Sequence, residues 1–227
     1  MKYAFVFTLL AVTLLCNAWW AETWRCTGLL AWAGIAFALV AMAYAGNAAW
    51  VFGKRADGRM QIVPTLVLLP YRLLAETIWW LNTRLSSEAP WHRVDDHLIV
   101  GRRLSARDGL PPGVSGVLDL TSEFSEPRFL RGTGYRCLPM LDASHADPLV
   151  IARMIREVAS QPGVLYVHCA QGHGRTGLIA ALILVARTPS LLPADALARL
   201  QAVRPGIGLS RRQFQALHSI AAQLAEA

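Results

Sequence analysis

The chain has 227 residues, of which 54% are hydrophobic and 16% charged. This composition is too apolar for a disordered chain and too weakly charged for an ordinary soluble protein. The net charge is +7, with seven Lys/Arg against three Asp/Glu in residues 1–87 and fifteen against twelve in residues 88–227. Because there is no zinc-finger spacing, aromatic-basic platform or Lys/Arg run, this balance favours a membrane surface as partner and no nucleic acid.

Two long stretches at the N-terminus carry no charge, Tyr3 to Trp20 and Gly28 to Phe52. Each is long enough to cross a hydrocarbon core of about 30 Å as a helix. The seven residues between them, Ala21 to Thr27, allow only a tight turn. The sequence therefore predicts a transmembrane hairpin of two helices.

The charges that flank this hairpin predict its orientation. Basic residues stand at its outer ends, at Lys2, Lys54, Arg55 and Arg59. Its turn offers only Arg25 against Glu22. By the positive-inside rule, both outer ends and the domain that follows lie in the cytoplasm. The alternative is that residues 1–18 are a cleaved signal peptide, which would leave one helix and could place that domain outside.

A third apolar stretch, Ile62 to Leu81, contains Pro64, Pro70, Arg72 and Glu76. Charges near the middle of a spanning helix are costly. The stretch fits an interfacial amphipathic helix along the membrane surface, and it equally fits a core helix of the next domain.

After Pro90, short β-rich runs alternate with helical ones, which is typical of an α/β domain. Strands are predicted at His97–Val100, Gly116–Leu120, Tyr135–Met140 and Val164–His168. Helices are predicted at Ala146–Ala159, Thr176–Ala186, Pro193–Val203 and Ser210–Ala225. Ser210 and Gln213 form a capping box for the last helix. The predicted organisation is a two-helix anchor over residues 1–60, an interfacial linker over 61–90 and an α/β domain over 91–227 with a central sheet flanked by helices.

The segment from Val164 to Gly177 places a buried strand before a glycine-rich loop and a helix. Such a loop can bind an anion, since the backbone N–H groups of residues 170–174 and the helix dipole face it. The loop residues are Ala170, Gln171, Gly172, His173 and Gly174. Arg175 adds a bidentate fork for phosphate.

Cys169 stands at the rim of this positive field, where we expect it to exist largely as thiolate, the form that attacks phosphorus. Thr176 can donate its hydroxyl to the thiolate when the sulfur leaves. The four cysteines, Cys16, Cys26, Cys137 and Cys169, form no CxxC pair. This spacing argues against disulfides and structural zinc and favours a reducing compartment, so no metal or cofactor is predicted.

The pattern His168-Cys169-x5-Arg175-Thr176 resembles the active-site loop of cysteine-dependent protein tyrosine and dual-specificity phosphatases. The resemblance covers about residues 91–225, the compact size of the dual-specificity type. It implies a cysteinyl-phosphate intermediate and a general acid on an upstream loop. Asp142 is the candidate acid, with Asp147 as the alternative.

The resemblance also assigns supporting roles and a function. It implies that His168 orients the loop, whereas His173 either touches the substrate or faces water. The predicted function is hydrolysis of phosphomonoesters on phosphorylated proteins at the membrane. The alternatives are a phospholipid head group, such as phosphatidylglycerophosphate or a phosphoinositide, or a catalytically silent phosphate-binding module.

Overall fold

The computed structural model describes residues 2–132 and 134–225. The chain divides into two compact units: residues 1–55, 59–85 and 122–124 form the first, and residues 56–58, 86–121 and 125–227 form the second. The helices of the first unit are α1 (Lys2–Trp19), α2 (Trp24–Ala45), η1 (Ala49–Phe52), α3 (Ile62–Val67) and α4 (Leu69–Leu85).

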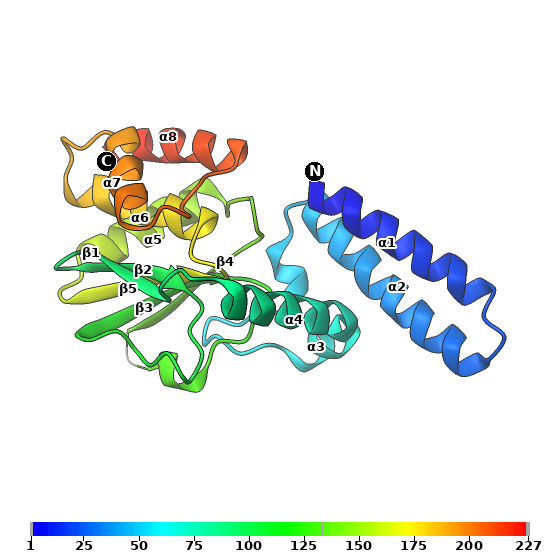
Figure 1. The fold of residues 1–227 in the computed structure, drawn as a ribbon. Helices are drawn as coiled ribbons and strands as arrows, with labels where there is room; N and C mark the ends of the chain where they lie inside the picture. The colour runs from blue at the N-terminus through cyan, green and yellow to red at the C-terminus, as the bar shows by residue number, and fades with distance from the viewer. Residues whose placement is uncertain (1, 133, 226–227) are drawn as a thin grey trace. The chain divides into compact units, whose positions relative to one another are not determined.

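Helices α1 and α2 lie side by side as a hairpin (Figure 1). Both are long and apolar enough to cross a membrane. The helices approach closely at Gly34, because a Cβ atom there would collide with the side chain of Leu15. The two predicted apolar helices are therefore present.

The bounds of these helices differ from those expected, for local reasons. Helix α2 begins earlier than expected because the hydroxyl of Thr23 caps its N-terminus by accepting from Cys26 N–H. It ends at Ala45, since Asn47 adopts a positive φ of 52°. The third apolar stretch is divided into α3 and α4, because Pro70 cannot continue α3 but is tolerated in the first turn of α4.

The second unit contains a five-stranded sheet in the order β1-β2-β5-β3-β4. Its strands are β1 (Trp91–Asp95), β2 (Leu98–Arg102), β3 (Val114–Thr121), β4 (Tyr135–Met140) and β5 (Val164–Cys169). Only β1 runs antiparallel, on the edge beside β2. The four predicted strands are present, and β1 is an additional strand.

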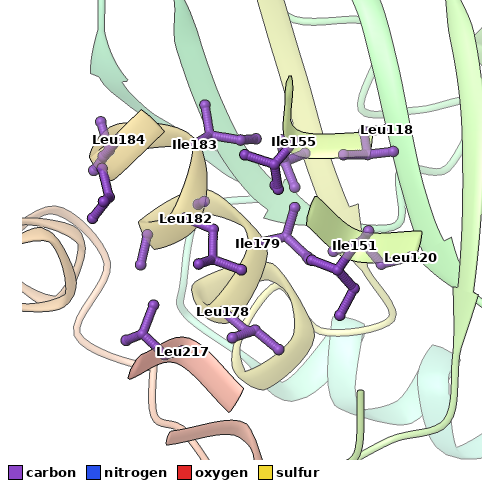
Figure 2. Packing of buried hydrophobic residues seen from close by; sticks show 14 of the residues in the cluster. Leu118, Leu120, Ile151, Ile155, Leu178, Ile179, Leu182, Ile183, Leu184 and Leu217 are labelled. Atoms are coloured by element: carbon purple, nitrogen blue, oxygen red, sulfur yellow. The ribbon is translucent and has the colours of Figure 1, made fainter. Parts of the chain in front are cut away.

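Helices α5 (Pro148–Ala159), α6 (Gly174–Arg187), α7 (Pro193–Val203) and α8 (Arg211–Ala225) lie over one face of this sheet (Figure 1). Helix α6 is at the centre of the core, with every residue from 175 to 185 buried. Figure 2 shows its leucine and isoleucine side chains among those of α5, α8 and β3. The predicted capping box is also present, with Ser210 N–H donating to Gln213 Oε1 at 3.0 Å and Gln213 N–H donating to Ser210 Oγ at 3.3 Å. The α/β prediction is confirmed.

Candidate active site

Cys169 is the last residue of β5, and the loop that follows leads directly into α6. Strand β5 lies between β2 and β3, to both of which it is parallel. In parallel sheets, ligands bind beyond the carboxyl ends of the strands, at the point where connections diverge to either side. The fold thus places Cys169, which is 3% exposed, at the expected position for a ligand site.

The loop after Cys169 is held in a narrow backbone path by two glycines. Gly172 has a φ of +75°, and a Cβ atom there would collide with the backbone of Gly101 and Arg102. A Cβ atom on Gly174 would lie 2.9 Å from Gln213 Oε1. At Gly172 only glycine fits without displacing β2, whereas at Gly174 the end of the Gln213 side chain would have to move.

The N-terminus of α6 opens toward this loop. Its N-cap residue, His173, makes no side-chain capping hydrogen bond. The first N–H groups of a helix need an acceptor, and an anion is a suitable one. The arrangement of loop and helix can therefore bind phosphate.

Arg175 links this loop to the end of β4. Its guanidinium is buried, donates from Nη1 to the carbonyl of Met140 at 2.9 Å, and places Nε 3.6 Å from Asp142 Oδ1. The Asp142 side chain is 44% exposed, so it can reach a substrate from solvent. The structure thus brings Asp142 next to the predicted phosphate-binding arginine.

Asp147 has a different position. Its carboxylate accepts from the N–H groups of Leu149 and Val150 and so caps α5. A carboxylate used in this way stabilises the helix N-terminus and is not available as a mobile proton donor. Of the two candidate acids, Asp142 is the one that lies beside Arg175.

The remaining predicted residues line or support the loop. The carbonyl of Ala170 accepts from Arg103 N–H at 3.3 Å, and the carbonyl of Gln171 accepts from Arg204 Nη2 at 3.0 Å. Thr176 is fully buried, and within the described part of the chain its hydroxyl has no hydrogen-bond partner. In this state it therefore does not hydrogen-bond to Cys169.

His168 is buried in the sheet directly before Cys169. Its Nε2 lies 3.3 Å from Glu126 Oε1 and its Nδ1 lies 3.4 Å from the carbonyl of Cys169. Its ring also stacks on Tyr166, with centroids 5.3 Å apart. These contacts fix the ring and leave it no route to a substrate, which suits a supporting role.

His168 belongs to a buried cluster whose possible ligand atoms lie close enough together to hold a metal ion. Among residues 2–132 and 134–225, one group of three has its candidate ligand atoms within 4.8 Å of one another: Asp119, Glu126 and His168. However, Asp119 already accepts from the hydroxyl and N–H of Thr121 and from the hydroxyl of Tyr135, each at 2.8 Å. The donor set fits a hydrogen-bond network behind the cysteine better than a metal centre.

The sequence assigned no site role to Arg204, which is 1% exposed and holds the outer side of the loop. Its Nε donates to the carbonyl of Gly172 at 3.0 Å and its Nη2 to that of Gln171. Its Nη1 donates to the carbonyl of Ala89 at 2.8 Å and lies 3.0 Å from His92 Nδ1. By holding the loop carbonyls outside, Arg204 leaves the loop N–H groups free to face an anion.

Glu88 neutralises the positive charge of this support. Its Oε2 lies 2.6 Å from Arg204 Nη2 and 2.8 Å from His173 Nε2. His173, for which the sequence left two roles open, therefore pairs with Glu88 in this structure. A Cβ atom on Gly206 would collide with His173 Nε2, so the chain is also tightly packed there.

Replacing Arg204 by lysine should lower kcat/KM by about ten- to hundredfold, because an ammonium group cannot hold two loop carbonyls and the loop shifts. Steady-state kinetics on an aryl phosphate would measure this loss. Arg211, which is exposed on α8, gives the matched control, and Arg211→Lys should leave kcat/KM unchanged. Equal kinetics for the two variants would show that Arg204 does not hold the loop.

His92 should make the fold sensitive to acid. Burial lowers the pKa of His92 from its usual value of 6.5, the guanidinium of Arg204 lowers it further, and the Glu88 carboxylate opposes this. The unfolded chain therefore binds a proton at a higher pH than the folded chain does, and stability is lost as the pH falls below about 6.5. Urea unfolding at about pH 7.5 and 5.5 should show a smaller loss for His92→Asn, which keeps an acceptor for Arg204. An equal loss in both proteins would contradict this role.

Comparison with known proteins places these features in a family. The protein-family model PTP-SAK, described as "Swiss Army Knife protein, DSP-PTPase phosphatase domain", matches residues 108–223. No curated protein sequence matches the chain.

Solved structures show the same fold at low identity. A mutant form of Tk-PTP has a TM-score of 0.52 and 22% identity, over 62% of this chain and 100% of that chain. The human tyrosine phosphatase-like serine/threonine/tyrosine-interacting protein has a TM-score of 0.51 and 18% identity, over 60% and 98%. PTPMT1 in complex with PI(5)P has a TM-score of 0.50 and 16% identity, over 60% and 97%. The family match covers half of the chain, and the chain therefore belongs to the dual-specificity type of cysteine-dependent protein tyrosine phosphatases.

Proposed function

We propose that the protein is a membrane-anchored phosphatase that hydrolyses phosphomonoesters through a cysteinyl phosphate on Cys169, with phosphorylated proteins at the membrane as substrates. The observation that carries the proposal is the placement of Cys169 and Arg175 at the two ends of one loop, which joins the end of β5 to the N-terminus of α6. The contact between Arg175 and Asp142 adds a proton donor beside that site.

In the first step, the thiolate of Cys169 attacks phosphorus and the bond from phosphorus to the ester oxygen breaks. Asp142 gives its proton to that oxygen, which leaves as an alcohol or phenol. The loop N–H groups and Arg175 bind the three phosphoryl oxygens, where negative charge accumulates. The product of this step is a cysteinyl phosphate and an Asp142 carboxylate.

In the second step, the oxygen of a water molecule attacks phosphorus while the Asp142 carboxylate takes a proton from that water. The bond between phosphorus and sulfur breaks, and the electron pair returns to Cys169. The buried hydroxyl of Thr176, after a rotation of its side chain, can donate to the sulfur and stabilise the departing thiolate. Inorganic phosphate is released and the enzyme returns to its starting state.

The neutral loop residues support a substrate with a single phosphate group. Ala170 and Gln171 carry no charge, and the imidazole of His173 is paired with Glu88. The loop therefore relies on Arg175 for its positive side chain toward phosphate, and a highly phosphorylated inositol ring would find few further cations there. A phosphorylated protein side chain fits this loop.

A lipid phosphate monoester is the second candidate, for two reasons. Helices α1 and α2 would hold the second unit, which contains Cys169 and is called the catalytic unit below, at a bilayer, where lipid head groups are abundant. In addition, PTPMT1, which shares the fold, is seen in complex with PI(5)P. A lipid with one phosphomonoester satisfies the same loop.

The anchor also supports a location. We propose that α1 and α2 span the membrane with the catalytic unit in the cytoplasm, because Lys2 precedes the apolar run of α1 and a basic cluster at residues 54–59 follows α2. A reporter fused after Ala227 tests this orientation. Reporter activity after export would overturn it.

Phosphate release by the purified full chain tests the function. We expect release from a phosphotyrosine or phosphothreonine peptide to exceed release from phosphatidylglycerophosphate and PI(5)P in micelles. Preference for either lipid would assign the second candidate. No release from any of them, with vanadate binding intact, would favour the remaining candidate, a catalytically silent phosphate-binding module.

A further inference from the structure

The sequence leaves two places open for the stretch that forms α3 and α4, the membrane surface or the core of the next domain, yet the structure packs it against the middle of the α1–α2 hairpin. We propose that α3 and the first turns of α4 enter the bilayer as a re-entrant hairpin, so that lipid hydrocarbon covers their exposed apolar side chains. The inference rests on the proposed spanning of the membrane by α1 and α2.

The contacts of Tyr71, in the first turns of α4, indicate how far this helix reaches along α1 and α2 from their outer ends. Its ring lies 5.6 Å from that of Phe7 in α1 and 6.3 Å from that of Phe37 in α2. Phe37 stands eight residues before the end of α2 at Ala45, which is about 12 Å along a helix axis. Tyr71 therefore lies well inside the span of the two helices.

The end of α3 lies deeper still. Trp32 Nε1 donates to the carbonyl of Val67 at 3.1 Å. Trp32 stands thirteen residues before Ala45, or about 20 Å along the axis of α2. An α3–α4 segment lying on the surface could not bring Val67 to this depth of a hydrocarbon core about 30 Å thick.

The hydrogen bond from Trp32 also meets a requirement that hydrocarbon imposes. Backbone groups at a break between helices have no water to bind in the bilayer, and they must find partners in the protein. The break between α3 and α4 occurs at Leu68, and the indole of Trp32 supplies the donor for the preceding carbonyl. The hydroxyls of two threonines near this break are satisfied as well, because Thr65 donates to the carbonyl of Gln61 and Thr77 to that of Leu73.

The exposed faces of α3 and α4 are apolar, as are the exposed faces of α1 and α2. Large apolar side chains are 38–76% exposed on α3 and on the first ten residues of α4: Ile62, Val63, Leu66, Leu73, Leu74 and Ile78. In water, exposure of this apolar surface would cost free energy, whereas the hydrocarbon around α1 and α2 would cover it.

The charged residues of α4 agree with a helix whose C-terminal end returns to the membrane surface. Arg72 and Glu76 stand one helical turn apart and both have interaction partners, as charges at membrane depth require. At the other end, the guanidinium of Arg84 lies 4.9 Å from the ring centroid of Trp80, a pairing typical of the interface. A re-entrant hairpin enters and leaves on one side of the membrane, so it agrees with the cytoplasmic location proposed above for the chain that follows α4.

Spin-label accessibility in vesicles tests the proposal on the full chain with its four native cysteines replaced by serine. Single labels are placed at Leu66 and Val63 on α3, at Leu9 in the middle of α1, and at Leu85 at the end of α4, all exposed positions. Only variants with unchanged helix content by circular dichroism are compared. A polar nickel complex should reach Leu66 and Val63 about tenfold less than Leu85, as it does Leu9, because hydrocarbon excludes it.

Three outcomes are distinguishable. Protection of both α3 labels together with the α1 label supports the re-entrant hairpin. Accessible α3 labels beside a protected α1 label overturn it and leave the spanning anchor intact. An α1 label as accessible as the one at Leu85 overturns the anchor and the re-entrant hairpin with it.

Discussion

Replacing Cys169 by serine should lower phosphate release by at least about 10⁴-fold, because a serine hydroxyl is a far weaker nucleophile than a thiolate. The substitution changes one atom in a site that is 3% exposed, so the fold and the anion-binding loop should remain. Release of inorganic phosphate from an aryl phosphate measures the loss, and vanadate binding by Cys169→Ser reports the intact loop.

Cys137→Ser is the matched control, because Cys137 lies on β4, is half-buried and makes no disulfide. It should keep nearly full activity. Mass spectrometry after acid quench should detect a phosphate on a peptide containing Cys169 in the parent protein and not in Cys169→Ser. A parent-like rate in Cys169→Ser would place the nucleophile elsewhere.

Replacing Asp142 by asparagine should lower kcat by about 10²–10⁴-fold, since an amide has no proton to give to the leaving oxygen. The loss should shrink for an aryl phosphate whose phenol leaves without protonation. This dependence on the leaving group separates a proton donor from a residue that only positions Arg175, which would slow all substrates equally.

Asp147→Ala distinguishes the two candidate acids. Loss of the cap on α5 should cost about 0.5–2 kcal/mol of the free energy of unfolding, measured in urea, while kcat stays unchanged. Asp142→Asn should show the reverse pattern. If Asp147→Ala carried the loss of kcat, the acid would be reassigned to the N-terminus of α5.

Much of the catalytic unit could be predicted because the signals are local. Strand β5, the loop and α6 are contiguous in sequence, so alternating and helical patterns and the glycines identify them together. Strand β1 was missed because it is a short edge strand with charged residues, such as Arg93, and lacks a hydrophobic run. The break in the third apolar stretch needed the structural consequence of Pro70, which sequence periodicity does not register.

The support around the loop could not be predicted, because its residues are distant in sequence. Arg204 contacts Ala89 across 115 residues, and His173 contacts Glu88 across 85. No spacing rule connects a single glutamate after a helix with a loop that far along the chain. Asp142, in contrast, could be named from the family resemblance, because it follows a predicted strand upstream of the loop, as the acid loop of that family does.

The hydrogen bond and ion pair of Arg204 with the segment before β1 have a consequence for shortened forms of the protein. Glu88 and Ala89 precede the first strand, yet their side chain and carbonyl hold the arginine that holds the loop. A soluble version that begins at Trp91 would lack both contacts and leave a buried cation without its carboxylate. A version that begins at Ser86 retains them, so the five residues Ser86–Pro90 belong to the catalytic machinery even though they belong to no strand or helix.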